Sequence, residues 1–175
     1  MGKTTSFFAF AAASLILCCC QQVKEVQTKS FKIGEEAAAG AVAYQVLDAE
    51  WKDSIEGSSA AVRVPTNRFL SIRLSIRNQS GKEVSLPFLS VTGKGGTSVM
   101  EVSEGQIPNW LGMLRGIAAG ETVEGQILFD VAPGSYKLRI TDGGEGEAEK
   151  TALVDLPDPM VGTDSPGLKP KSSTE

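Results

Sequence analysis

The sequence contains no histidine, and its three cysteines all lie within residues 18–20. Imidazole is the commonest general base, and imidazole and thiolate are the commonest transition-metal ligands, so the chain after residue 20 lacks both groups. This excludes Ser-His-Asp and Cys-His catalysis, and it leaves no cysteine to form a disulfide bond. Asp and Glu are plentiful, but no spacing marks two of them as a catalytic pair. We therefore expect a domain that is not an enzyme and that is stabilised by its core alone.

The sequence also lacks long blocks of like charges. The chain has 17 basic and 21 acidic residues, a net charge of −4, and no block of five or six like charges. Nucleic-acid binding needs a basic patch or stripe, so nucleic acid is excluded as a predicted partner.

No apolar run is long enough to cross a bilayer, and the longest lies at the N-terminus. Residues 7–17 are apolar but too few to cross a bilayer, and they follow a short stretch with Lys3 as its one charge. The sequence Leu17-Cys18-Cys19-Cys20 fits the box L-x-x-C of a bacterial lipoprotein signal. We predict a signal peptide over residues 1–19 and covalent diacylglycerol and fatty acyl (palmitate) chains on Cys20, with Cys19 as the alternative.

The competing interpretation is a secretory signal that is cut without lipidation. It predicts a small residue such as alanine at the cleavage site, and residues 18–22 contain none. A lipid anchor places the protein in the cell envelope, facing the periplasm or the surface, with residues 20–30 as a spacer. Two or three acyl chains hold a protein firmly, because each buried CH₂ contributes about 0.8 kcal/mol. Which membrane carries the anchor stays open.

The mature chain shows a period of two. Residues 69–78 are the clearest predicted strand, because residues 70–77 alternate strictly between apolar and polar side chains, as a half-buried strand does. Residues 123–131 and 136–140 repeat this pattern, and residues 42–51 follow it less regularly. Residues 84–91 and 148–155 are further predicted strands. Pro87 cannot donate to a strand ladder, so it indicates an edge or a bulge. Residues 108–117 allow one or two helical turns, interrupted by Gly112 and Gly116.

Strands spaced about ten residues apart, with Gly and Pro turns between them, predict an all-β antiparallel sandwich of seven or eight strands. One domain would occupy residues 31–155. Residues 156–175 are rich in Pro, Gly, Ser and Thr, a composition typical of a disordered tail.

The order of these signals resembles a known family. Ile33-Gly34-Glu35 precedes the strand ending at Trp51, Asn78-x-Ser80 closes the next long strand, and residues 119–125 read AGETVEG before ILFDV and Tyr136-x-Leu138. This is similar to the telokin-like, immunoglobulin-fold domain of bacterial lipoproteins and secreted immunoprotective antigens, whose function is unassigned. The resemblance implies an immunoglobulin-like sandwich and transfers no catalytic residue. One departure is Lys94, where an acidic residue is expected beside the glycine.

An immunoglobulin-like fold further suggests a tyrosine corner at Tyr136, whose hydroxyl would bond the backbone upstream. Leu138 would then take the place of the usual buried cysteine. The alternative is that Tyr136 is an inward-facing aromatic residue without this bond.

The segment that follows Ile107 is the candidate partner loop, because Trp, Met and Arg are enriched in protein interfaces. Its candidate contact residues are Trp110, Leu111, Met113 and Arg115. In the alternative interpretation the segment covers one end of the sandwich and buries Trp110 and Leu114. An envelope protein that meets these loops or a strand edge is the predicted partner, and the oligomeric state stays open.

A weaker candidate is the acidic stretch that contains Asp142, Glu145 and Glu147, whose oxygen ligands could hold Ca²⁺. Its spacing matches no known calcium loop, so a solvated hairpin is the simpler interpretation and no metal is predicted. The rival functions are therefore a small-ligand or calcium carrier and an accessory subunit of an envelope complex.

Overall fold

The structure, a computed structural model, describes residues 29–56, 62–103, 107–113 and 115–158. The predicted signal peptide, the lipidation site at Cys20 or Cys19, and residues 159–175 lie outside these ranges. In the described part of the chain, no helix is long and apolar enough to pass through a membrane.

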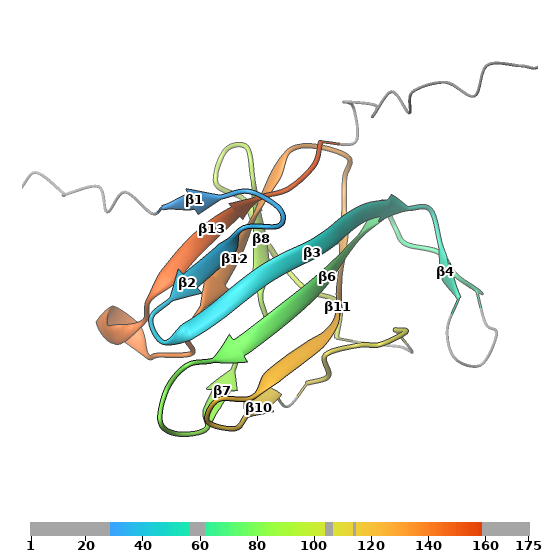
Figure 1. The fold of residues 1–175 in the computed structure, drawn as a ribbon. Helices are drawn as coiled ribbons and strands as arrows, with labels where there is room; N and C mark the ends of the chain where they lie inside the picture. Colours follow the sequence, from blue (N-terminus) through green and yellow to red (C-terminus); the bar gives the residue numbers. More distant parts are fainter. Residues whose placement is uncertain (1–28, 57–61, 104–106, 114, 159–175) are drawn as a thin grey trace, which may run out of the picture.

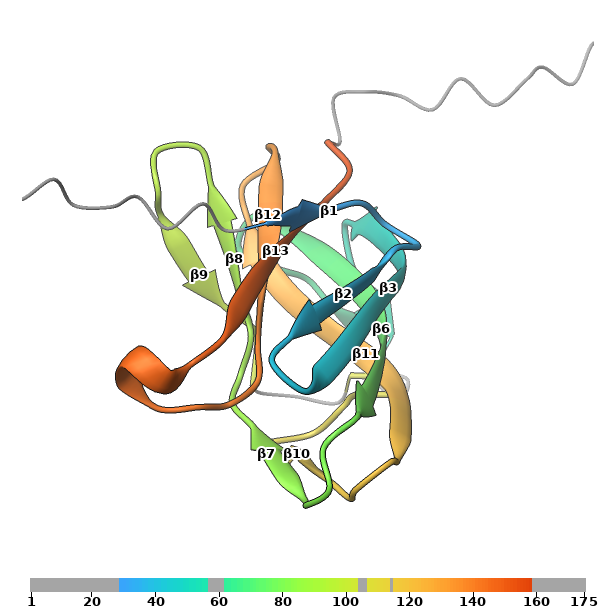
Figure 2. The same cartoon turned by 60° about the vertical axis from the view of Figure 1, so that its left-hand side comes forward.

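Two β-sheets face each other, as predicted, and enclose the main core (Figure 1; Figure 2 shows the layers from the side). The five-stranded sheet has, in order, β1 (Ser30–Phe31), β13 (Thr151–Asp155), β12 (Tyr136–Thr141), β8 (Ser90–Gly93) and β9 (Ser98–Met100). The four-stranded sheet has, in order, β11 (Thr122–Val131), β6 (Arg68–Asn78), β3 (Val42–Lys52) and β2 (Glu36–Ala39). Two short ladders, β7 (Val84–Leu86) with β10 (Arg115–Ile117) and β4 (Ile55–Glu56) with β5 (Val62–Arg63), flank the sandwich, and a single 3₁₀ turn covers Gly146–Ala148.

β6 forms the centre of the four-stranded sheet, and its alternation explains why. Its apolar side chains Leu70, Ile72, Leu74 and Ile76 are fully buried in the main core, whereas Arg73 is exposed. Antiparallel ladders to β3 and β11 satisfy its backbone along nearly its whole length. The amphipathic pattern of the sequence is therefore realised here as predicted.

A buried phenol joins the two sheets across the core. Tyr44 of β3 is fully buried, and its hydroxyl donates a hydrogen bond to the backbone carbonyl of Thr141 in β12. Burial raises the pKa of the Tyr44 phenol, and the bond from its hydroxyl to the carbonyl of Thr141 only partly offsets this. The phenol therefore stays neutral and acts as a fixed donor between the layers.

A second, smaller core lies on the opposite face of the four-stranded sheet. Phe69 and Leu128 point outward from β6 and β11, yet both are fully buried, because Ile55 and Ile107 pack over them. Val102 and Trp110 pack against the same cluster. The alternation of β6 predicts a solvated outer face, and the structure shows that this end of the face is covered.

Three expectations about elements are corrected. Residues 84–91 do not form one strand: the chain leaves β7 at Leu86, passes Pro87, which cannot donate to a ladder, and starts β8 in the five-stranded sheet. The sandwich is not wholly antiparallel, because β1 pairs with β13 in parallel. The described residues between 108 and 117 contain an isolated β-bridge and β10 and no helical turn, since the backbone takes positive φ at Asn109 and Gly112.

The predicted boundary of the tail at residue 156 is placed too early. Leu156 is 9% exposed, and its N–H donates to the carbonyl of Tyr136 at 3.0 Å. The carbonyl of Pro157 accepts from the Trp51 indole at 3.2 Å, and Asp158 accepts from the Ser135 hydroxyl. The packed chain thus continues to Asp158, and the rest of the predicted tail lies outside the described residues.

Candidate functional site

The candidate partner loop runs along the outer edge of β11. Gln126 donates its backbone N–H to the carbonyl of Asn109 at 2.7 Å, and its own carbonyl accepts from the N–H of Leu111 at 3.2 Å. Val102 donates to the carbonyl of Leu128 at 2.7 Å further along the same edge. The chain therefore covers with its own backbone an edge that would otherwise be open.

Trp110 is neither fully exposed, as one sequence interpretation predicts, nor fully buried, as the other predicts. Trp110 is half-buried and packs against the smaller core, so part of its surface stays accessible to solvent. Its indole Nε1 is shielded from solvent and has no hydrogen-bond partner among the residues that the structure describes. Trp110 therefore serves as a partial core residue that still contributes surface.

Leu111 and Met113 differ in what they present. Leu111 is partly buried against the main core, and Met113 has 62% of its surface exposed. Leu114, which the alternative interpretation buries, lies outside the described residues. Of the candidate contact residues, Met113 is the one that offers a large apolar side chain to solvent.

Arg115 does not belong to the contact surface, which corrects the prediction. It is 4% exposed, and its guanidinium donates to both carboxylate oxygens of the buried Glu101, at 2.8 and 2.5 Å. Glu101 also accepts the backbone N–H of Leu89, and Arg115 lies over the ring of Phe88 with 5.4 Å to its centroid. A paired, desolvated arginine has an architectural role, and the sequence offered no sign that its partner was Glu101.

The same arginine fixes the candidate loop in place. Its Nε donates to the carbonyl of Gly112 at 3.0 Å, directly before Met113. The exposed methionine is therefore presented from a segment held at both ends, by β11 and by the buried ion pair.

The acidic stretch does not converge on a cation site. Asp142 accepts the backbone N–H groups of Gly144 and Lys150 and so closes its own loop, while Glu145 and Glu147 are exposed. Glu149 binds Arg139 at 2.7 Å, and this bond, with a second from Thr141, lowers the pKa of its carboxyl group. Among the residues that the structure describes, no group of three potential ligands could hold a metal ion.

Tyr136 forms the tyrosine corner. Its hydroxyl donates to the carbonyl of Ala132, four residues upstream, at 2.8 Å, and Leu138 is fully buried two residues later. The Trp51 ring of the opposite sheet lies 6.1 Å away, centroid to centroid. Two aromatic residues thus close this end of the sandwich.

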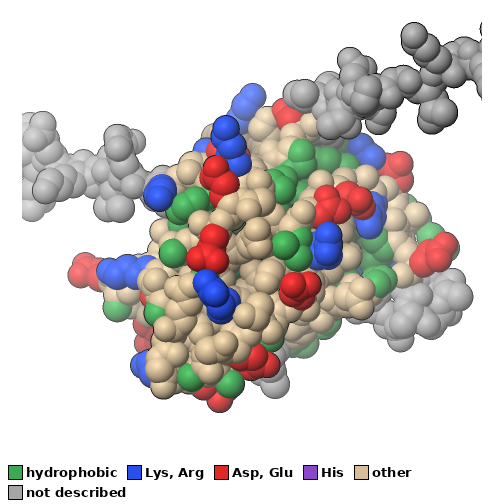
Figure 3. Space-filling view, in the orientation of Figure 1, with side chains coloured by type: hydrophobic (Ala, Val, Ile, Leu, Met, Phe, Trp, Pro, Cys, Tyr) green, Lys and Arg blue, Asp and Glu red, His purple; other side chains and the backbone are tan. Residues whose placement is uncertain are grey.

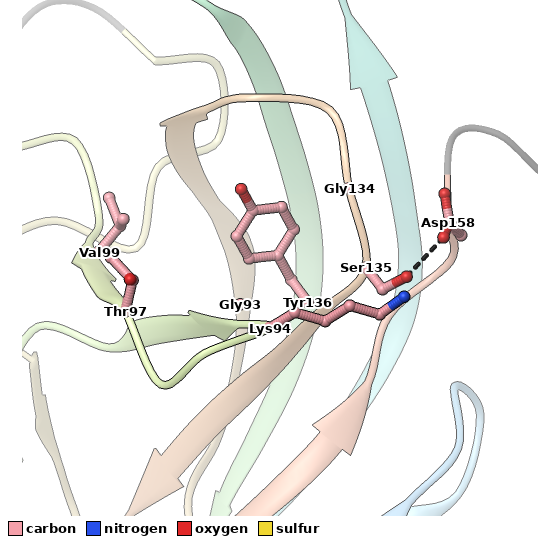
Figure 4. A pocket seen from close by; sticks show the side chains of 8 residues that line it. All are labelled: Gly93, Lys94, Thr97, Val99, Gly134, Ser135, Tyr136 and Asp158. Carbon is pink, nitrogen blue, oxygen red and sulfur yellow. Dashed lines mark hydrogen bonds between the residues drawn. The ribbon is translucent and has the colours of Figure 1, made fainter.

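The sequence did not single out a hollow beside this corner (Figure 4). A cavity of about 430 Å³ opens there, and a second hollow of about 310 Å³ adjoins it, sharing Lys94 and Tyr136. Elsewhere, basic and acidic side chains are interspersed over the face that Figure 3 shows, as the scattered charges of the sequence predict. The cavity is lined by Gly93, Lys94, Thr97, Val99, Gly134, Ser135, Tyr136 and Asp158.

Together these features define the class of protein: a single-domain, immunoglobulin-like β-sandwich with two layers and a tyrosine corner. The profile of the family DUF4352, a domain of unknown function, matches residues 31–149, and the chain belongs to this family. The comparison supports a family of unknown function and does not extend to the telokin-like label. No functionally curated protein matches the chain significantly.

Solved structures confirm the fold. The yjhA protein of Bacillus subtilis is 18% identical, with a TM-score of 0.56 over 73% of this chain and 99% of its own. The secreted protein MPT63 of Mycobacterium tuberculosis is 13% identical, with a TM-score of 0.55 over 75% and 99%. The candidate lipoprotein ycdA of B. subtilis is 16% identical, with a TM-score of 0.54 over 69% of this chain and 38% of its own. At these identities the likeness shows the fold alone.

Proposed function

We propose that this protein is a lipid-anchored module of the cell envelope that binds another envelope protein and catalyses no reaction. The N-terminal apolar run followed by Leu17-Cys18-Cys19-Cys20 supports the anchor. The candidate lipoprotein and the secreted protein among the structural neighbours are consistent with this setting. We also propose that the domain is telokin-like, and the tyrosine corner at Tyr136 supports this.

The observation that carries the binding function is the rigid presentation of Met113. The segment before it is tied to β11 through Gln126, and Arg115 holds the carbonyl of Gly112. A preorganised loop loses little conformational entropy on binding, and Trp and Met side chains are favoured at interface centres. Met113 together with the accessible side of Trp110 is therefore the proposed contact surface.

Two further observations favour binding over chemistry. The chain after residue 20 has no histidine and no cysteine, and the acidic residues of the 142–149 loop are engaged in closing that loop or are dispersed in solvent. This arrangement does not support the alternative function of a calcium carrier. An accessory subunit of a larger envelope complex would use the same contact surface.

Metabolic labelling with a fatty acid tests the anchor. The wild-type chain and the Cys19→Ala variant should incorporate label, and Cys20→Ala should lose it and leave the membrane fraction. Loss of label with Cys19→Ala alone would move the anchor by one residue. A wild-type chain without lipid would refute the anchor and leave a secreted module.

Site-specific photo-crosslinking in intact cells tests the contact surface. A benzophenone side chain at Met113 should give a discrete protein adduct. The matched control is Val64, which is 72% exposed but lies in the chain between β5 and β6. Equal adduct patterns at both positions, or none at Met113, would contradict the proposed surface.

A further inference from the structure

The outer edge of β9 has the geometry of an unoccupied strand position. Gly93 donates to the carbonyl of Thr97 at 3.0 Å and Glu101 donates to that of Leu89 at 3.2 Å, which identifies the hydrogen-bonded pairs of the β8–β9 ladder. In an antiparallel ladder the intervening residues turn their N–H and C=O groups to the other side. Ser98 and Met100 therefore point these groups away from β8, and in the described part of the chain no hydrogen bond engages them.

The other sheet edges differ from β9. The edge of β11 is bonded to the chain's own Val102 and Asn109–Leu111 backbone, and β2 lies beside β13 in both ribbon views. β1 spans only Ser30–Phe31. Among the described edges of the two main sheets, the edge of β9 is thus the one that combines outward backbone groups with this cavity.

The cavity adjoins this edge on the inner face of the sheet. Thr97 and Val99 line one side of it, and Tyr136 lies between them and Ser135 (Figure 4). A strand that pairs with Ser98 and Met100 would place the side chain opposite Val99 on the same face as Val99. A cavity of about 430 Å³ has room for an apolar side chain at that position.

The turn before β9 supplies a cation, Lys94. Lys94 occupies the tight β8–β9 turn, whose Gly95 and Gly96 take positive φ of 88° and 81°. Its side chain extends toward Ser135 and Asp158 (Figure 4), and no ion pair in the described residues includes it. The nearby acids are otherwise engaged, since Asp155 binds Lys137 at 2.7 Å and Asp158 accepts from Ser135.

We infer that β9 is a docking site for an extended peptide of a partner protein, added antiparallel as a new edge strand. The chain direction places the carboxyl end of such a peptide beside Ser98 and hence beside the Lys94 turn. The peptide would carry an apolar side chain for the cavity and a carboxylate, terminal or from Asp or Glu, for Lys94. Main-chain bonds would give affinity, and the cavity and Lys94 would give specificity.

This inference deepens the proposed binding function and adds a second, chemically defined surface to it. Random peptides of about ten residues with free carboxyl ends, displayed against the lipidated full-length chain in nanodiscs, serve as the probe. An enriched peptide is then labelled with fluorescein, and its dissociation constant is measured by anisotropy. Binding should also slow amide exchange at Ser98 and Met100.

Two variants with matched controls decide the outcome. Ser98→Pro removes an outward N–H that β8 does not use, so binding should weaken about tenfold or more, whereas Ser98→Ala keeps it. Lys94→Glu should weaken binding about fivefold relative to Lys82→Glu, an exposed lysine at the opposite end. Lys94→Glu also keeps the test valid if Ser98→Pro does not fold.

Amidating the peptide separates a terminal carboxylate, whose loss weakens binding, from an internal acid. A library without enrichment, or equal binding by Ser98→Pro and Ser98→Ala, would overturn the inference. Crosslinking at Met113 would be unaffected by that result, so failure of the β9 site is distinguishable from failure of the proposed function.

Discussion

Asn78, at the end of β6, holds together two turns at one end of the sandwich. The two N–H groups of its fully buried side-chain amide are shared among the carbonyls of Lys82, Ile117 and Ala118, which lie 2.7, 2.9 and 3.1 Å from the nitrogen. Its carbonyl oxygen accepts the N–H and the hydroxyl of Ser80. One side chain thereby satisfies backbone groups of the β6–β7 turn and of the chain after β10.

Asn78→Ala should lower the free energy of unfolding by about 3 kcal/mol, because it leaves the buried carbonyl of Ile117 and the part-buried carbonyls of Lys82 and Ala118 without this donor. Urea denaturation followed by fluorescence measures the change. The control is Gln79→Ala, which removes an exposed side chain and should shift stability by less than about 0.5 kcal/mol. A similar loss in both variants would contradict the role of Asn78.

Asp130, near the end of β11, makes the stability depend on pH. Partial burial, the largest single influence, raises the pKa of its carboxyl group, but hydrogen bonds from Thr66 and Asn67 together hold it below its usual value. These bonds measure 2.7 and 2.8 Å from the two backbone N–H groups. Because the folded state has the lower pKa, the stabilisation is present above the unfolded value near 4 and is lost as the pH falls below it.

Asp130→Asn should therefore cost about 1 kcal/mol at pH 7, and the difference from wild type should shrink below about pH 4. Thermal unfolding at a series of pH values measures this. Glu56→Gln, at an exposed carboxylate, should follow the wild-type profile. A cost independent of pH would show that the charge of Asp130 does not matter.

At the scale of elements, the Glu101–Arg115 ion pair holds the crossing from β7 to β8. Besides pairing with each other, the two residues bond the Leu89 N–H and the Pro87 carbonyl, on either side of Phe88. The crossing itself carries no ladder, so these bonds replace the missing sheet partners. Because both side chains are desolvated, removing either leaves the other buried and unpaired.

Glu101→Gln should destabilise the fold by about 3 kcal/mol or more, while the double variant Glu101→Leu with Arg115→Met should recover at least half of that loss. Urea denaturation of the single and the double variant measures both. The exposed pair of Glu36 and Arg77 is the control, and Glu36→Gln should cost less than about 0.5 kcal/mol. Equal losses in the single and double variants would argue against a buried charge penalty.

Gly125 lets the candidate loop lie against β11. A Cβ at this position would stand 2.7 Å from Leu111 Cγ and 2.9 Å from the carbonyl oxygen of Asn109. Real Cβ atoms do not approach so closely, so Gly125→Ala should displace the loop and expose Trp110. Gly81, whose Cβ would meet nothing within 4 Å, provides the control.

In a Trp51→Phe background Trp110 is the remaining indole, since the chain has two tryptophans. There, Gly125→Ala should shift the emission to longer wavelength, increase quenching by acrylamide and cost about 2 kcal/mol. Gly81→Ala should leave all three unchanged. Unaltered emission in Gly125→Ala would mean that the loop adapts without leaving β11.

At the scale of the whole molecule, the folded unit extends beyond the last strand. The backbone and side chains of residues 156–158 bond to Tyr136, Trp51 and Ser135, which lie in both sheets or in the connection between them. A chain that ends at Asp155 should be less stable than one that ends at Asp158 by about 2 kcal/mol, mainly from the loss of buried Leu156. Calorimetry of the two truncated chains measures this. Equal melting temperatures would support the predicted tail boundary at residue 156.

Much of the sandwich could be predicted because its signals are local. The alternation of β6 and of β11, and the Gly-rich turn between β12 and β13, each specify an element within about ten residues. The helical turns expected after Pro108 failed for the opposite reason. That stretch has a weak local preference, and the backbone partners it finds on Gln126 lie in another strand.

The candidate site was also predicted only in part. Trp110 and Met113 were singled out by composition, and the structure leaves part of the first and most of the second accessible. Arg115 was misplaced because its charge suggested surface, whereas its neutralising partner Glu101 is distant in sequence and adjacent in space. The β9 edge and its cavity had no local signal, since they arise where β8, β9, β12 and a crossing loop meet.

The sequence by itself determined the period-two pattern, the turns, and the absence of histidine throughout and of cysteine after residue 20, because each is a property of neighbouring residues or of composition. Only the tertiary structure decided which polar groups are buried and paired, which strand edge is covered and where an open edge adjoins a cavity. Burial and pairing depend on residues far apart in the chain, and their consequences for charge and for free backbone groups exist only once the sheets have packed.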